Sequence, residues 1–250
     1  MSARVARDLG RDPAGSDALG FVFPVYGWRI PRILSRFIAE ELPARLAGRR
    51  PAFVWAVMTC GDDVGYTDRT LDAALRASVG YTLDAAYSVN MPDTYLGLPG
   101  FRLDSPEEQE AKFKIAVTRL AAIRESLAAH ARVRDLKRGP FPQTKTVLLG
   151  GFFDRFLSGD RRWRVDGEKC TRCGLCVARC PTGAILMDAG GRISWSRDGR
   201  CTGCFRCYHN CPSDAISCGR STRGKGRLPS SVRGGVSEIE FHPSGVCVND

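Results

Sequence analysis

Two runs of closely spaced cysteines place the strongest constraint on how this chain folds. Each run has the spacing C-x2-C-x2-C-x3-C and is followed directly by proline. Eight of the 11 cysteines belong to them, namely Cys170, Cys173, Cys176 and Cys180, and then Cys201, Cys204, Cys207 and Cys211. The second run repeats the first 31 residues later, and the similarity continues through residues 181–185 and 212–216. The region is therefore an internal duplication, whose halves should fold as two similar units.

The spacing within each run is typical of a [4Fe–4S] site. Three thiolates separated by two residues can bind one cluster, whereas the fourth cysteine lies too far along the chain and binds the other cluster. We expect one cluster to take Cys170, Cys173, Cys176 and Cys211, and the other to take Cys201, Cys204, Cys207 and Cys180. Structural zinc is the alternative, but zinc sites usually combine two separated C-x2-C pairs. The pattern therefore favours two four-iron clusters.

With these motifs, residues 161–218 resemble the bacterial two-cluster ferredoxins. The resemblance implies a small α+β domain that carries electrons at low potential. His209 lies inside the second cysteine run, where we expect an exposed loop imidazole or a hydrogen bond to a cluster sulfur. Residues 219–250 form a basic stretch rich in Gly and Ser, which we expect to be a solvated tail.

Composition and charge narrow the possible functions. No stretch approaches ~18 consecutive apolar residues, so we expect no membrane span. The first residues lack the apolar core of a signal peptide, so we expect a cytoplasmic protein with reduced thiols. The formal charge of +10 suits an acidic partner or nucleic acid. Because no nucleic-acid-reading module accompanies the charge, we expect a redox protein as the partner instead.

An α/β pattern runs through residues 19–150. Apolar runs predict buried strands, and amphipathic stretches between them predict helices. The strands are expected at residues 19–23, 52–58 and 83–89, and the helices near Pro31, over residues 66–79 and from Ser105 onward. The last helix opens with a capping box and has an apolar stripe of Phe113, Ala116, Leu120, Ile123 and Leu127. This alternation predicts a parallel sheet with helices on both faces.

Two loops that follow predicted strands have the chemistry to hold a flat ligand. Tyr26 and Trp28 follow the first strand, where their rings could stack on a ring system. Thr59, Cys60 and Gly61 follow the second strand and could pass along the edge of that ring. Ligands bind at such strand ends in open α/β sheets. The alternative is that the two aromatic side chains only pack between the sheet and the ferredoxin part, and that Cys60 is a small buried thiol.

The residues of these loops also resemble a bacterial family that fuses a flavodoxin-like domain to a two-cluster ferredoxin, annotated in places as "ferrodoxin". The resemblance rests on residues 20–28, Ile30 with Pro31, residues 59–61 with Gly65, and residues 91–93. It implies a flavodoxin-like sheet and FMN as a second cofactor. It also implies that Tyr26 and Trp28 lie beside the isoalloxazine, with Thr59, Cys60 and Gly61 along its other side.

The chain departs from that family at its start. A flavodoxin-like domain begins with a central strand and a Ser/Thr/Gly/Asn-rich loop that wraps the FMN phosphate. This strand and loop, with the helix and second strand that follow, need ~30–40 residues. Residues 1–18 supply neither feature and are expected to be a truncated or disordered lead. Either the true chain starts upstream, which we favour, or the domain survives only as a scaffold. We therefore expect FMN to bind weakly or not at all.

These observations favour a low-potential electron carrier over a self-contained enzyme. No Ser/His/Asp or Cys/His triad and no phosphate-cradling motif is present. Two alternatives remain open, an FMN and iron–sulfur oxidoreductase domain acting on an unknown small molecule, and an iron–sulfur redox sensor or scaffold. Cys218 and Cys247 lie outside the motifs and are expected to be free thiols.

Overall fold

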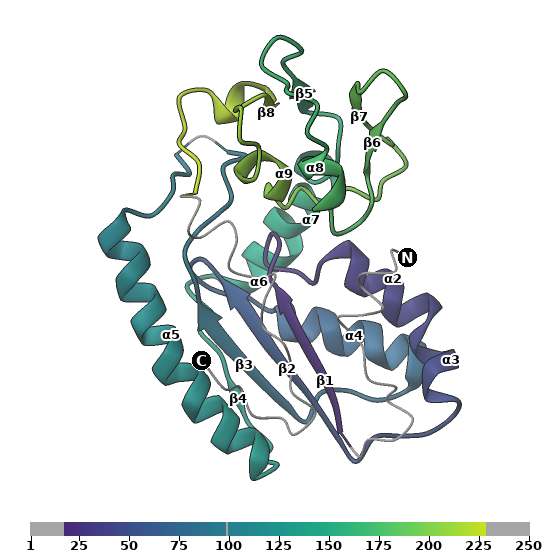
Figure 1. Ribbon diagram of the computed structural model, residues 1–250. Coiled ribbons are helices and arrows are strands. Elements are labelled where there is room, and N and C mark those ends of the chain that lie inside the picture. Colours follow the sequence, from purple (N-terminus) through teal and green to yellow (C-terminus); the bar gives the residue numbers. More distant parts are fainter. Residues whose placement is uncertain (1–17, 99, 229–250) are drawn as a thin grey trace, which may run out of the picture.

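The computed structural model describes residues 18–98 and 100–228 (Figure 1). Its N-terminal part contains a parallel sheet of β1 (Ala18–Pro24), β2 (Phe53–Cys60), β3 (Ala85–Asn90) and β4 (Arg134–Asp135), in that order. Pro24 lies opposite Thr59, and Cys60 lies opposite Asn90, so β1, β2 and β3 end at the same edge of the sheet. The predicted α/β arrangement is confirmed.

Helices cover both faces of this sheet, as predicted. α2 (Arg32–Glu40), α3 (Leu42–Leu46) and α4 (Thr67–Val79) pack on one face, and α5 (Pro106–Ala128) packs on the other (Figure 1). Gly80 ends α4 in the left-handed conformation, and Ser105 with Glu108 forms the predicted capping box of α5. The predicted stripe of α5 is partly wrong. Ala116 and Ile123 are buried against the sheet, but Phe113 and Leu120 are 37% and 48% exposed, because the short sheet, whose strand β4 has only two residues, covers only part of this long helix.

A helical linker joins the sheet to the C-terminal part. It consists of α6 (Pro142–Thr144), the π-helical turn η2 (Lys145–Leu149), α7 (Gly150–Phe152) and a second π-helical turn η3 (Phe153–Leu157). Gly150 lets this linker approach the loop after β1, because a Cβ at this position would lie 2.5 Å from the carbonyl oxygen of Gly27. The linker therefore fixes the Tyr26–Trp28 loop from one side.

The C-terminal part confirms the duplication seen in the sequence. β5 (Trp163–Val165) pairs with β8 (Ile216–Cys218), and β6 (Ile185–Met187) pairs with β7 (Ile193–Trp195), both antiparallel. The short helices α8 (Leu175–Ala178) and α9 (Arg206–His209) occupy equivalent positions 31 residues apart, and so do β6 and β8. A 3-10 turn, η4 (Gly219–Thr222), follows β8.

The segment after β3 fastens the two parts together. We call residues 91–98 and 100–104 the crossover segment. Its Leu96 is fully buried in the core of the C-terminal part, and its Tyr95 ring packs edge-on against Phe205 at 5.1 Å. None of the helices among the described residues is long and apolar enough to span a membrane.

Two expectations change because of this packing. His209 is 3% exposed rather than a loop imidazole in solvent, and its Nε2 atom lies 2.8 Å from the carbonyl oxygen of Thr94 in the crossover segment. The start of the basic stretch is anchored rather than solvated. The Lys225 ammonium donates to the carbonyl of Leu98 at 2.8 Å, and Arg227 forms an ion pair with Asp214 at 2.5 Å. Cys247 lies outside the described residues.

Candidate iron–sulfur centres and the adjoining cavity

The first three cysteines of the first run gather with the last cysteine of the second run. Cys170, Cys173, Cys176 and Cys211 line one small cavity between α8 and the loop before β8. Burial raises the pKa of the Cys176 thiol to about 11, and the neighbouring thiols that raise it further are those of Cys211, Cys173 and Cys170. The folded chain thus brings together the four cysteines expected to share one cluster.

The second group combines the first three cysteines of the second run, Cys201, Cys204 and Cys207, with Cys180, the last cysteine of the first run. Burial raises the pKa of Cys201 to about 12, and the adjacent thiols of Cys204 and Cys180 add to this rise. The pKa values of Cys204 and Cys207 are also raised, first by burial and then by nearby thiols that include Cys180. Cys180 therefore lies with the cysteines of the other run.

Equivalent hydrogen bonds hold the two exchanged cysteines. The backbone N–H of Ala184 donates to Cys180 Sγ at 3.3 Å, and the backbone N–H of Ala215 donates to Cys211 Sγ at 3.3 Å. Hydroxyl groups lie at matching places, with Thr182 Oγ1 3.6 Å from Cys180 Sγ. Donors of this kind stabilise negative charge on sulfur and tune the potential of an iron–sulfur cluster.

The thiol environment requires a metal for ionisation. With pKa values raised by burial, the bare thiols stay neutral near pH 7, whereas a bound metal deprotonates a coordinating thiol outright. No three His, Cys, Asp or Glu side chains among the described residues converge closely enough to hold a single metal ion. In a four-iron cluster each thiolate binds its own iron, whereas the ligands of tetrahedral zinc surround one ion.

The two groups differ in their surroundings. Cys173 of the first group is exposed, whereas Cys201 and Cys207 of the second are buried. The second group faces the N-terminal part, because Cys204 and Tyr26 of the loop after β1 line the same cavity. Burial raises the pKa of the Tyr26 hydroxyl, and the neighbouring thiol of Cys204 raises it further. One group therefore lies near the outer surface, and the other lies beside the strand ends of the sheet.

A cavity of about 630 Å³ lies between the second group and the strand ends. Its walls include all five residues expected to contact a flat ligand, which are Tyr26, Trp28, Thr59, Cys60 and Gly61, and also Cys204 of the second cysteine group. The crossover segment and the linker add aromatic walls from Tyr95, Phe101 and Phe153. These three residues were missed by the sequence analysis, because long-range packing brings them to the strand ends and no local pattern marks them.

Cys60 is a buried thiol within this cavity wall. It is 7% exposed, and its pKa is raised to about 12 by burial and, next, by the charge of Asp63. A thiol with such a pKa is protonated near pH 7 and is a poor nucleophile. Its place in the wall fits contact with a bound ring and gives no support for covalent chemistry.

Comparisons with known proteins agree with the metal centres. A family model described as a 4Fe-4S dicluster domain matches residues 162–225, which contain both cysteine runs. A second model with the same description matches residues 132–184, of which only the final part carries a cysteine run. No curated protein matches the chain. The C-terminal half therefore contains ferredoxin-type 4Fe-4S domains, and such domains indicate iron–sulfur electron transfer.

Proposed function

We propose that the protein transfers electrons through two [4Fe–4S] clusters with exchanged ligands. One cluster is held by Cys170, Cys173, Cys176 and Cys211, and the other by Cys201, Cys204, Cys207 and Cys180. The observation that carries the proposal is the matched placement of Cys180 and Cys211, each beside the other run and each accepting a hydrogen bond from a backbone N–H at 3.3 Å. The clusters supply the one-electron redox chemistry, while the chain supplies ligands, hydrogen bonds and burial.

The surroundings of the two cysteine groups support a route for electrons between the outer surface and the cavity at the strand ends. The exposed Cys173 lies toward the outer surface, while Cys204 borders the cavity at the strand ends. We further propose that residues 19–150 form a flavodoxin-like domain and that residues 161–218 form the ferredoxin domain. In this arrangement the α/β domain covers the second group and excludes water from it.

An anaerobic reductive titration tests the proposal. Chains purified without oxygen should take up about two electrons each from dithionite, one for each cluster, with loss of visible absorbance. Variants in which all four cysteines of one run are replaced by alanine should take up none, because each run supplies ligands to both clusters. Uptake of no electrons by the intact protein would contradict the proposed function.

The cavity favours a second, linked function, an oxidoreductase domain with a flavin ring at the strand ends. Its apolar walls, aromatic side chains and contact with Cys204 suit an isoalloxazine placed within reach of the second cluster. A loop rich in Ser, Thr, Gly and Asn that could wrap a phosphate is not found among the described residues. We therefore infer that the ring, and not the phosphate, provides the binding energy, and that FMN binds weakly.

This inference predicts how flavins bind. FMN should be present at well below one molecule per chain after purification, and added riboflavin should bind as well as FMN, because the described residues contain no loop that could wrap the phosphate that riboflavin lacks. Trp28→Ala should weaken both flavins about tenfold, which corresponds to about 1.4 kcal/mol, while the exposed Phe156→Ala should change neither. Quenching of flavin fluorescence measures the affinities. Stoichiometric FMN that survives purification would contradict the weak-binding proposal.

A further inference from the structure

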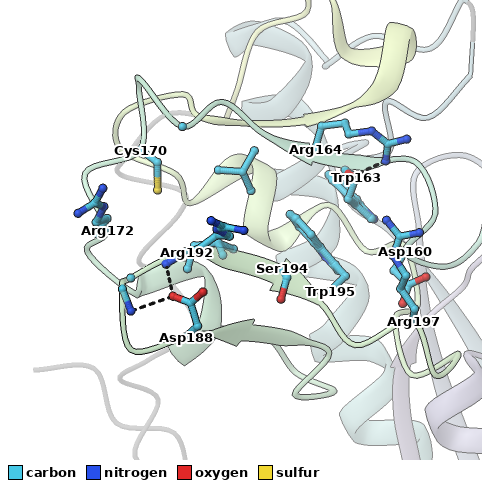
Figure 2. Close-up of a pocket in the computed structure, with 15 residues that line it drawn as sticks. Asp160, Trp163, Arg164, Cys170, Arg172, Asp188, Arg192, Ser194, Trp195 and Arg197 are labelled. Atoms are coloured by element: carbon cyan, nitrogen blue, oxygen red, sulfur yellow. Dashed lines mark hydrogen bonds between the residues drawn. The ribbon is translucent and has the colours of Figure 1, made fainter.

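A second large cavity lies on the far side of the first cysteine group. Its volume is about 520 Å³, and its walls come from β5, β7 and the loops that lead to them (Figure 2). Cys170 of the first cluster group lines one end of it, near Arg172, and Trp163 and Trp195 lie toward the other end. The mechanism proposed above does not use this cavity.

Four arginines line the cavity, Arg164, Arg172, Arg192 and Arg197. All four are exposed, and none forms an ion pair with another described residue. The one exposed carboxylate in the wall, Asp188, accepts hydrogen bonds from the backbone N–H groups of Gly190 at 3.0 Å and Arg192 at 2.8 Å instead. The cavity therefore presents several uncompensated positive charges to the solvent.

The local backbone holds one of these side chains over the cavity. Gly191 has a φ of +77°, and a Cβ there would lie 2.8 Å from Cδ of Arg172. Only glycine lets the stem of Arg172 lie against this turn, which directs its guanidinium to the rim beside Cys170 (Figure 2). This charge is therefore held close to a predicted cluster ligand.

The net positive charge of the protein is concentrated in the C-terminal part, which contains this cavity. Residues 161–228 carry 14 Lys and Arg against five Asp and Glu, whereas the rest of the chain carries 23 against 22. Two oxidised clusters with their thiolates, at about −2 each, leave the region clearly positive. A charge distribution of this kind attracts an acidic partner to one face and speeds its association.

We propose that this arginine-lined cavity is the docking site of an acidic electron-transfer protein. The carboxylates of the partner would pair with Arg164, Arg172, Arg192 and Arg197. The half-buried indole ring of Trp195 supplies an apolar centre for the interface, and it is held in place by stacking on the buried ring of Trp163 at 6.0 Å with an interplanar angle of 10°. Docking there brings the partner next to Cys170, so that an electron passes between the first cluster and the partner over a short distance.

The proposal rests on the proposed function and is tested by the rate of electron transfer. The protein is reduced with dithionite, freed of excess reductant and mixed in a stopped-flow instrument with an oxidised flavodoxin of net negative charge. Each transfer removes one electron from the reduced protein and adds one to the flavin of the probe. Duroquinone, an uncharged small oxidant, replaces flavodoxin in a parallel series.

Two charge-reversed variants make the test specific. Arg164→Glu with Arg192→Glu changes the cavity, whereas Arg76→Glu with Arg124→Glu makes the same change in net charge on exposed positions of α4 and α5. At low salt, the cavity variant should react with flavodoxin at least about tenfold more slowly, and the slope of the rate against salt should flatten. The α4 and α5 variant should react as the unchanged protein does, and duroquinone should oxidise all three proteins equally.

Each outcome decides one of the two proposals. Equal slowing with flavodoxin in both charge-reversed variants, or no slowing in the cavity variant, would overturn the docking site. The milder change of Arg164→Gln with Arg192→Gln should give an intermediate rate, which confirms that charge, and not a damaged fold, causes the effect. Failure of the unchanged protein to reduce duroquinone would contradict the proposed electron transfer and not the docking site.

Discussion

Replacement of Asp68 by asparagine should lower the free energy of unfolding of the α/β domain by about 3 kcal/mol. Asp68 lies at the start of α4, is fully buried, and pairs with Arg138 at 2.8 Å and with Arg134 at 2.9 Å. Burial alone would raise the pKa of its carboxyl, but the hydrogen bonds and charges of the two arginines overcome this and lower the pKa. Asp68→Asn removes the negative charge and leaves Arg138 without an ion-pair partner among the described residues.

The urea midpoint, followed by far-UV circular dichroism without oxygen, measures this loss. A decrease of roughly 1.5 M corresponds to about 3 kcal/mol at a slope of about 2 kcal/mol per M. Asp62→Asn is the matched control, because the Asp62 side chain is 83% exposed and its pair with Lys137, at 3.3 Å, contributes little. A loss no larger than that of the control would contradict the role given to Asp68.

The pH dependence of the same loss follows from the direction of the pKa shift. A carboxyl with a lowered pKa stabilises the fold fully above its unfolded pKa of about 3.9, and loses this contribution as the pH falls through the lower pKa of the folded state. The difference between the unchanged protein and Asp68→Asn should therefore be the same at pH 7 and pH 5. A difference that already shrinks at pH 5 would show that the pKa is not lowered.

The grouping of the cysteines can be predicted from the sequence because its determinants are local. Cysteine spacing and the following proline are properties of short segments, and the 31-residue repeat predicts equivalent elements, which α8 and α9 confirm. The strands and the capping box at Ser105 are likewise set by patterns of a few residues. Pro24 and Cys60 end neighbouring parallel strands, so the position of the cavity at the strand ends follows from general rules for parallel sheets.

The remaining features depend on contacts between distant segments, which leave no local pattern. Leu96 belongs to the crossover segment but is buried in the core of the ferredoxin-type part. His209 is enclosed by that segment, and its Nδ1 atom accepts a hydrogen bond from the N–H of Leu228 at 3.3 Å. Phe113 looks like a core position of α5 by its spacing, yet it lies in the wall of the cavity at the strand ends. Each assignment requires knowledge of which segments meet.

The largest predicted effect concerns iron content in variants that combine two cysteine replacements. Intact protein purified without oxygen should contain about eight iron atoms per chain, and Cys170→Ala or Cys211→Ala alone should leave about four. Cys170→Ala combined with Cys211→Ala should also leave about four, because both residues are assigned to one cluster. Cys204→Ala combined with Cys211→Ala should leave almost none, because these residues are assigned to different clusters although they belong to the same run.

Iron and acid-labile sulfide in these two double variants therefore test the exchanged ligands most directly. We expect about four iron atoms, with matching sulfide, for the pair from different runs and almost none for the pair from the same run. The reverse order would show that Cys211 binds the cluster of its own run. Zinc in place of iron and sulfide in the intact protein would contradict the iron–sulfur assignment altogether.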